Sequence, residues 1–135
     1  MVDKKTLVSD LVELTDHGYF LIKKIDFDEE NFGNFCIELN SNNQVSIRFI
    51  RDKGTFWCEV GKNDEWYFIE DVFSLFGLDT SVEKSDVREF LKYMSKLLSL
   101  NTTKILNVFD AKNYEETQFK VKKIATERAL KMFKS

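Results

Sequence analysis

The sequence contains no proline, one histidine, two cysteines and no long apolar run. Because a membrane-spanning helix needs about 20 apolar residues in succession, the sequence predicts no membrane segment. The single histidine, His17, excludes most histidine-based metal sites and leaves one base for any nucleophile–histidine pair. There is no zinc spacing of cysteine or histidine, no glycine-rich phosphate loop and no G-x-S-x-G elbow. We therefore expect no metal, no cofactor and no enzymatic activity.

The cysteines and the N-terminal residues bear on the cellular compartment. Cys58 is in phase with the apolar residues around it, whereas Cys36 is out of phase with its own neighbours. In adjacent strands the two side chains would point to opposite faces, so we expect two free thiols. The N-terminus leads into an amphipathic stretch with acidic residues and not into a signal-peptide apolar segment. The prediction is a cytoplasmic protein.

What the sequence does have is an unusual number of aromatic residues. It contains 13 Phe, 4 Tyr and 2 Trp among 135 residues, and 43% of the chain is hydrophobic. Each Phe carries a large apolar area, so we expect most of them in a core. The length predicts a single domain, residues 1–135.

Residues 35–61 carry the clearest pattern in the chain. Apolar residues alternate with polar or small ones over three stretches, 35–39, 45–49 and 56–60. This alternation predicts three strands with one apolar face, joined by turns rich in Asn, Asp and Gly. Residues 19–27 predict a further strand, with a continued helix as the alternative. Residues 66–68 either extend the sheet or dock against it.

Helices are predicted on both sides of these strands, at 3–15, 70–76, 84–100 and 114–133. Between the last two, residues 101–109 either prolong a bent helix or form a second one. Strands come first and most helices last, which indicates an α+β fold. We expect an antiparallel β-meander of about four strands, with an N-terminal helix and the C-terminal helices packed on one face.

The outward side of the predicted sheet is the first candidate binding surface. Glu38, Arg48 and Glu59 are out of phase with the apolar residues and fall on neighbouring strands. They predict a cross-strand charge ladder, with Trp57 stacked on the Arg48 guanidinium. Such a face is either a charge-paired surface or a binding face, since Trp and Arg dominate interface hot spots. Trp66 is a second candidate anchor.

The distribution of charge suggests a second candidate surface. Residues 1–83 hold 8 basic and 17 acidic residues, whereas residues 84–135 hold 12 and 6. Either the two halves neutralise each other, or the acidic half faces a basic partner. The acidic residues expected to bind such a partner form two groups: Asp26, Asp28, Glu29 and Glu30 at the end of the first predicted strand and in the loop after it, and Asp64 and Glu65 in a second loop.

Basic residues gather on the last predicted helix, with Lys120, Lys123, Lys131 and Lys134 roughly along one stripe. A basic stripe can follow nucleic-acid phosphates. Glu127 interrupts this stripe, no aromatic residue is interleaved, and the protein is acidic overall. We therefore interpret the stripe as a solvated helix face and expect no nucleic-acid partner.

A series of motifs in the central part is recognisable. A Phe-Gly-Asn entry at 32–34 leads to a strand, a turn and then Ile-Arg-Phe-Ile-Arg-Asp-Lys-Gly at 47–54. An aromatic strand follows, and Trp66 then precedes a short helix that ends in Leu-Phe-Gly at 75–77. Over residues 19–77 the chain resembles small bacterial proteins, several of them immunity proteins that neutralise polymorphic or contact-dependent toxins. The resemblance implies stoichiometric binding to a cognate toxin and supplies no catalytic residues.

Two functions follow from these observations. The first is an immunity protein whose acidic surface covers the basic cleft of a toxin, for example a nuclease. The alternative is an adaptor, encoded by a phage or mobile element, that binds a host protein. An enzyme would need Glu38 and Glu59 as acid and base, and Arg48 between them would keep both ionised.

Overall fold

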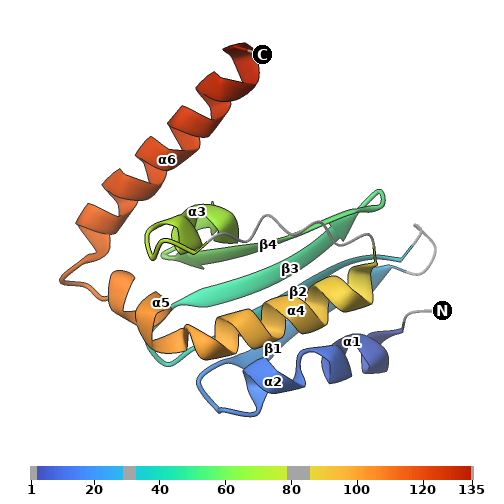
Figure 1. The fold of residues 1–135 in the computed structure, drawn as a ribbon. Helices are drawn as coiled ribbons and strands as arrows, with labels where there is room; N and C mark the ends of the chain where they lie inside the picture. The colour runs from blue at the N-terminus through green and yellow to red at the C-terminus, as the bar shows by residue number, and fades with distance from the viewer. Residues whose placement is uncertain (1–2, 29–32, 79–85, 135) are drawn as a thin grey trace.

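A five-stranded antiparallel sheet organises the structure, a computed structural model that describes residues 3–28, 33–78 and 86–134. The strands are β1 (Leu21–Asp28), β2 (Asn34–Asn40), β3 (Ser46–Asp52), β4 (Thr55–Lys62) and β5 (Glu65–Phe68). Each strand pairs with the next one in the sequence, in the order β1-β2-β3-β4-β5. The predicted meander is confirmed, and residues 65–68 add the fifth strand (Figure 1).

The tight hairpins depend on residues that accept a left-handed backbone. Lys53 and Gly54, with φ of 52° and 82°, connect β3 to β4. Asn63 and Asp64, with φ of 55° and 64°, connect β4 to β5. Two successive residues with positive φ match the right-handed twist of the flanking strands. Asp64 therefore holds a turn position.

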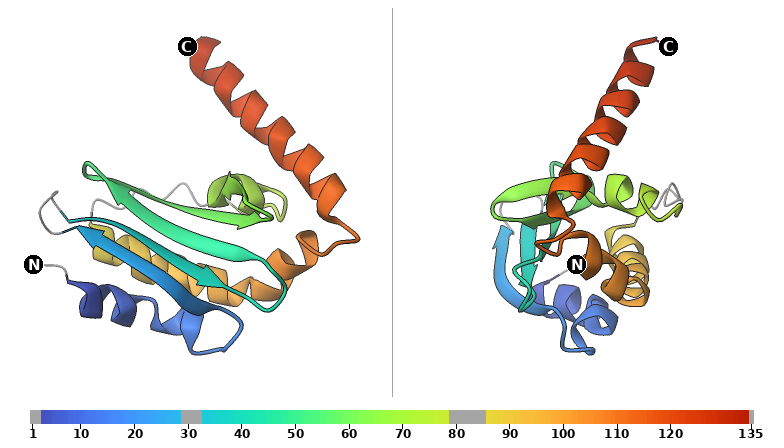
Figure 2. Two further views of the ribbon diagram at one scale, coloured as in Figure 1. Left: turned by 180° about the vertical axis from the view of Figure 1, so that it is seen from behind. Right: turned by 90° about the vertical axis from the view of Figure 1, so that its left-hand side faces the viewer.

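The described parts of the chain contain six helices: α1 (Lys4–Asp10), α2 (Val12–Thr15), α3 (Ile69–Ser74), α4 (Val87–Leu100), α5 (Thr102–Val108) and α6 (Tyr114–Lys134). Helices α1, α2, α4 and α5 lie on one side of the sheet, whereas the other side carries no described helix (Figure 2). This arrangement confirms the predicted α+β fold with helices on one face. Two helices, α4 and α5, occupy the segment for which one bent helix was the alternative.

The side of the sheet that faces the helices forms the core. The alternating residues predicted to point inward on β2, β3 and β4 are almost all fully buried, and Phe56 is partly buried: Phe35, Ile37, Leu39, Val45, Ile47, Phe49, Phe56, Cys58 and Val60. Leu7, Leu11 and Leu14 cover them from the N-terminal helices, and Leu91, Met94 and Leu98 from α4. Cys36 and Cys58 point to opposite faces, and both are free thiols.

The N-terminal helix is interrupted, which the sequence did not predict. Leu11 leaves helical geometry between α1 and α2, with φ of −99° and ψ of 9°. The backbone N–H of Leu14 donates to the Ser95 hydroxyl on α4 at 3.0 Å, and both residues are fully buried. The apolar periodicity continues through the break, because Leu7, Leu11 and Leu14 all reach the core. The break is therefore accompanied by a hydrogen bond between two residues that are 81 positions apart in the chain.

Ion pairs join the acidic and basic parts of the chain. The buried Asp10 carboxylate on α1 accepts two hydrogen bonds from Arg88 on α4, at 3.0 and 3.1 Å. Asp71 on α3 is also buried and pairs with Arg128 on α6. Part of the charge asymmetry of the sequence is therefore neutralised inside the fold.

Helix α6 leaves the body of the protein at an angle, and its C-terminal end stands clear in all views (Figures 1 and 2). In the first turns of α6, Thr117 and Val121 are buried against the body, and further along the helix the Arg128 side chain reaches α3. The guanidinium of Arg128 also lies 5.3 Å from the centre of the Phe68 ring on β5. None of the helices in the described parts of the chain is both long and apolar enough to cross a bilayer.

Candidate protein-binding face on the sheet

The side of the sheet without helices, called the outer face from here on, is built of half-exposed side chains in cross-strand rows. One row contains Glu38, Arg48 and Glu59, which are directly opposite one another on β2, β3 and β4. The next row contains Cys36, Ile50 and Trp57 on the same three strands. The sequence prediction that Glu38, Arg48, Trp57 and Glu59 point outward is consistent with this register.

The charged side chains of the first row form ion pairs within the protein. The Arg48 guanidinium pairs with the Glu59 carboxylate, and Lys23 of β1 lies 3.5 Å from Glu38. The aromatic ring stacked on Arg48 is Trp66, with the guanidinium carbon 4.1 Å from the ring centre. The predicted stacking of Trp57 on Arg48 is therefore wrong.

Gly61 explains why Trp66 reaches Arg48. Gly61 on β4 pairs with Trp66 on β5. A Cβ atom at Gly61 would lie 2.9 and 3.0 Å from two atoms of the indole. The missing side chain leaves room for the ring to lie across β4, an arrangement known to stabilise glycine in sheets. Arg48 is thus held between Glu59 and Trp66, and this cluster fixes the orientation of β3, β4 and β5.

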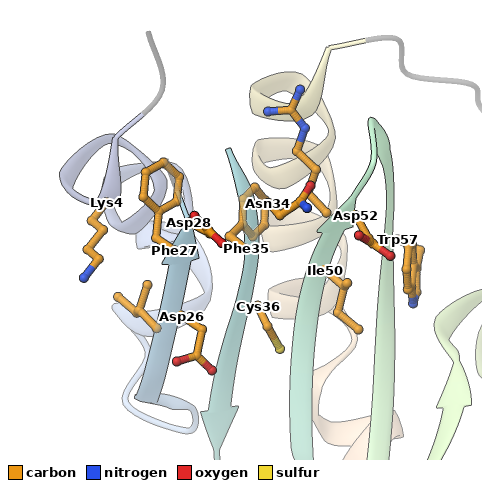
Figure 3. A pocket seen from close by; sticks show the side chains of 12 residues that line it. Lys4, Asp26, Phe27, Asp28, Asn34, Phe35, Cys36, Ile50, Asp52 and Trp57 are labelled. Carbon is orange, nitrogen blue, oxygen red and sulfur yellow. The ribbon is translucent and has the colours of Figure 1, made fainter. Parts of the chain in front are cut away.

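Among the described residues, the apolar row forms no comparable ion pair or ring contact. Cys36, Ile50 and Trp57 lie side by side on β2, β3 and β4 and are each partly buried (Figure 3). They line an open groove of about 640 Å³ near the end of the sheet, with Asp26, Asp28 and Asp52 among the other lining residues. A partly exposed apolar row with a polar rim is compatible with a protein-binding site.

Two polar atoms in this row have distinctive environments. Burial raises the pKa of the Cys36 thiol, which favours the neutral form. The indole N–H of Trp57 is shielded from solvent and has no acceptor among the residues that the structure describes. An unsatisfied buried donor costs about 1–3 kcal/mol, so this N–H lowers the stability of the folded protein.

The predicted acidic residues do not form one binding surface. Asp26 is exposed and lies 3.3 Å from Lys24, and Asp28 lines the groove. Glu29 and Glu30 lie outside the described residues. Asp26 and Asp28 are on β1, whereas Asp64 and Glu65 are at the β4–β5 hairpin.

The Glu65 carboxylate forms hydrogen bonds within the protein. It accepts hydrogen bonds from the Tyr67 hydroxyl at 2.9 Å and from Gln118 of α6 at 2.6 Å. These two hydrogen bonds hold the pKa of Glu65 below its usual value, the Tyr67 bond contributing most. Glu65 therefore ties the edge strand β5 to α6.

Ile50 is the residue of this face that the sequence reasoning missed. It follows Phe49 directly, so it is out of phase with the buried residues Ile47 and Phe49 and in phase with Arg48. An apolar residue at an outward position was the available signal, and Cys36 gave the same signal on β2.

The side chains of the described residues form no group of three or more His, Cys, Asp or Glu that could hold a metal ion. The outer face therefore offers aromatic, aliphatic and paired charged groups, which suit contact with another protein surface. Comparison with protein-family models, curated proteins and solved structures found no match to this chain.

Proposed function

We propose that this protein acts in the cytoplasm by binding another protein through the outer face of its sheet, and that the partner is a toxin which it neutralises as an immunity protein. The observation that carries the proposal is the apolar row Cys36–Ile50–Trp57 on a sheet face that no described helix covers. The resemblance of residues 19–77 to immunity proteins supports the choice of partner.

The arrangement of the face suits binding without a large rearrangement. Arg48, Glu59 and Trp66 hold one another in place beside the apolar row. Preorganised side chains lose little conformational entropy when a partner binds. Trp57 would supply the central anchor, because large aromatic residues in partly desolvated positions contribute most to interface free energy.

The acidic residues at the groove would assist a basic partner. Asp26, Asp28 and Asp52 line the groove together with Lys4 and Arg51, so acidic groups exceed basic ones there. An acidic rim increases the association rate with a basic protein and makes that rate sensitive to salt. A nuclease toxin, whose active cleft must attract phosphates, fits this requirement.

The test is co-expression with the product of the adjacent gene. We expect that product to be toxic alone, to co-purify with this protein, and to be released by Trp57→Ala or Ile50→Glu, each weakening binding at least tenfold. Val12→Glu is the matched control, because Val12 on α2 is 53% exposed but belongs to the helical side. Circular dichroism and thermal melting would verify that all three variants fold.

Three results would contradict the proposal. If the neighbouring product is harmless and this protein protects no cell, the assignment as an immunity protein is wrong. If a host housekeeping protein is captured instead, the adaptor function replaces it. If binding survives both outer-face variants but is lost in Val12→Glu, the binding face has been placed on the wrong side of the sheet.

A further inference from the structure

Helix α6 exposes two large apolar side chains, three turns apart, on the surface opposite its contacts with the body, and the exposed Lys122, Lys123 and Thr126 lie between them. Phe119 is 71% exposed and Leu130 is 53% exposed, although both are large apolar side chains. A helix advances about 100° per residue, so these two residues, eleven positions apart, differ by only about 20° around the axis. Val121, which is 1% exposed, points about 160° away from Phe119.

The fold leaves this surface open. Thr117, Val121 and Arg128 fix the inner side of α6 to the body, so Phe119 and Leu130 face away from it. The helix also rises clear of the sheet and of the other helices toward its C-terminus (Figures 1 and 2). A neighbouring helix could therefore lie along this side without meeting the rest of the protein.

We propose that a second copy of this chain covers this surface, through antiparallel pairing of the two α6 helices around a two-fold axis. Antiparallel pairing centred between residues 124 and 125 places Phe119 of each copy against Leu130 of the other. Both contacts then join exposed apolar side chains, as expected for a self-complementary interface. The seam between Phe119 and Leu130 spans about 17 Å of helix.

Charge complementarity selects the second copy and the antiparallel direction. Lys123 and Glu127 flank the seam on the same side, and neither has an ion-pair partner within the described parts of the chain. In the antiparallel register Lys123 of each copy lies beside Glu127 of the other, which gives two ion pairs. A parallel pairing would instead place Lys123 and Glu127 of one copy on the opposite side of the seam from those of the other, so neither ion pair could form.

The short seam limits the strength of the dimer. Stable interfaces bury about 1,200–2,000 Å² in total, and three turns of a helix pair provide less than this. We therefore expect a reversible dimer with a Kd on the order of 10–100 µM. The proposed interface consists of α6 residues alone, so the dimer does not depend on the proposed function.

Analytical ultracentrifugation of the full chain tests the proposal. Between about 1 and 300 µM, the mass should rise from that of the 15.9 kDa monomer toward twice that value. Phe119→Ser should keep the protein monomeric, as should Lys123→Glu, which places two acidic residues side by side. The double variant Lys123→Glu/Glu127→Lys exchanges the charges and should restore the dimer. All three sites are exposed, so folding should be unaffected, and circular dichroism checks this.

Direction is tested by cysteine cross-linking. A mixture of Phe119→Cys and Leu130→Cys proteins should form disulfide-linked heterodimers faster than either variant forms homodimers. Faster homodimers of Phe119→Cys would overturn the antiparallel register. A protein that stays monomeric at all concentrations, or a dimer unaffected by Phe119→Ser, would overturn the proposal as a whole.

Discussion

Replacing Gly61 with alanine tests whether this glycine is what allows Trp66 to reach Arg48. The added Cβ atom would lie 2.4 Å from the carbonyl oxygen of Glu65 and 2.9 Å from the Trp66 ring. An ordinary C···O contact is about 3.3 Å, so the oxygen of the paired strand must move by about 1 Å. Because that oxygen belongs to the backbone, rotation of a side chain cannot relieve the contact.

The magnitude follows from two opposing effects. Overpacking of this kind costs about 3 kcal/mol at the upper end of its usual range. Alanine also reduces the conformational freedom of the unfolded chain, which returns about 0.5–1 kcal/mol. The free energy of unfolding should therefore fall by about 2 kcal/mol, and Tm by about 8 °C for a domain of this size.

Urea denaturation gives the free energy, and tryptophan emission reports the position of Trp66. Gly54→Ala is the control: its Cβ would meet nothing within 4 Å, so only its φ of +82° opposes the change. That control should cost about 1 kcal/mol and leave the emission unchanged. A Gly61→Ala protein within about 0.5 kcal/mol of wild type, with unaltered emission, would refute the explanation given for the Trp66–Arg48 stack.

Two further changes probe stability. Burial raises the pKa of Glu70, so the folded protein holds the proton of this carboxyl group more tightly than the unfolded chain does. The contribution of Glu70 to stability therefore falls as the pH rises above about 4.5. Urea melts between pH 4 and 7 should show Glu70→Gln becoming increasingly more stable than wild type, and a difference that stays constant with pH would contradict this. Ser95→Ala removes one of two acceptors of the Leu14 N–H, which also donates to the Leu11 carbonyl at 3.1 Å. The change should cost about 1 kcal/mol in thermal melts, whereas Ser99→Ala on the same helix should cost less than half as much.

The strands could be predicted because alternation is a local property. Ile47 and Phe49 point inward and Arg48 outward for the same reason, and the structure agrees at each position. The interruption at Leu11 could not be predicted, because the three leucines keep helical spacing through it. Its hydrogen-bond partner, Ser95, is on another helix, and no local pattern specifies that contact.

On the outer face, too, some features could be predicted from the sequence and others could not. The phase of the sequence indicates that Trp57 and Arg48 share a face, but it does not determine which ring lies on the guanidinium. That depends on the β4–β5 hairpin, which places Trp66 opposite Gly61. Glu65 was expected to bind a partner, and the sequence did not predict that it also joins β5 to α6, a contact 53 residues apart in the chain. Long-range pairing of this kind leaves no signature in a single sequence.

The nearest-neighbour order of the strands has a consequence for biosynthesis. Because every strand pairs with the one made just before it, the whole sheet can form from local hairpins as the chain leaves the ribosome, without waiting for distant segments. The apolar side of the sheet, however, is covered in part by α4 and α5, and these two helices are synthesised after all five strands. During that interval the nascent sheet exposes a surface prone to aggregation. Synthesis slowed between residues 68 and 109 should therefore lower the soluble yield more than the same delay within the sheet.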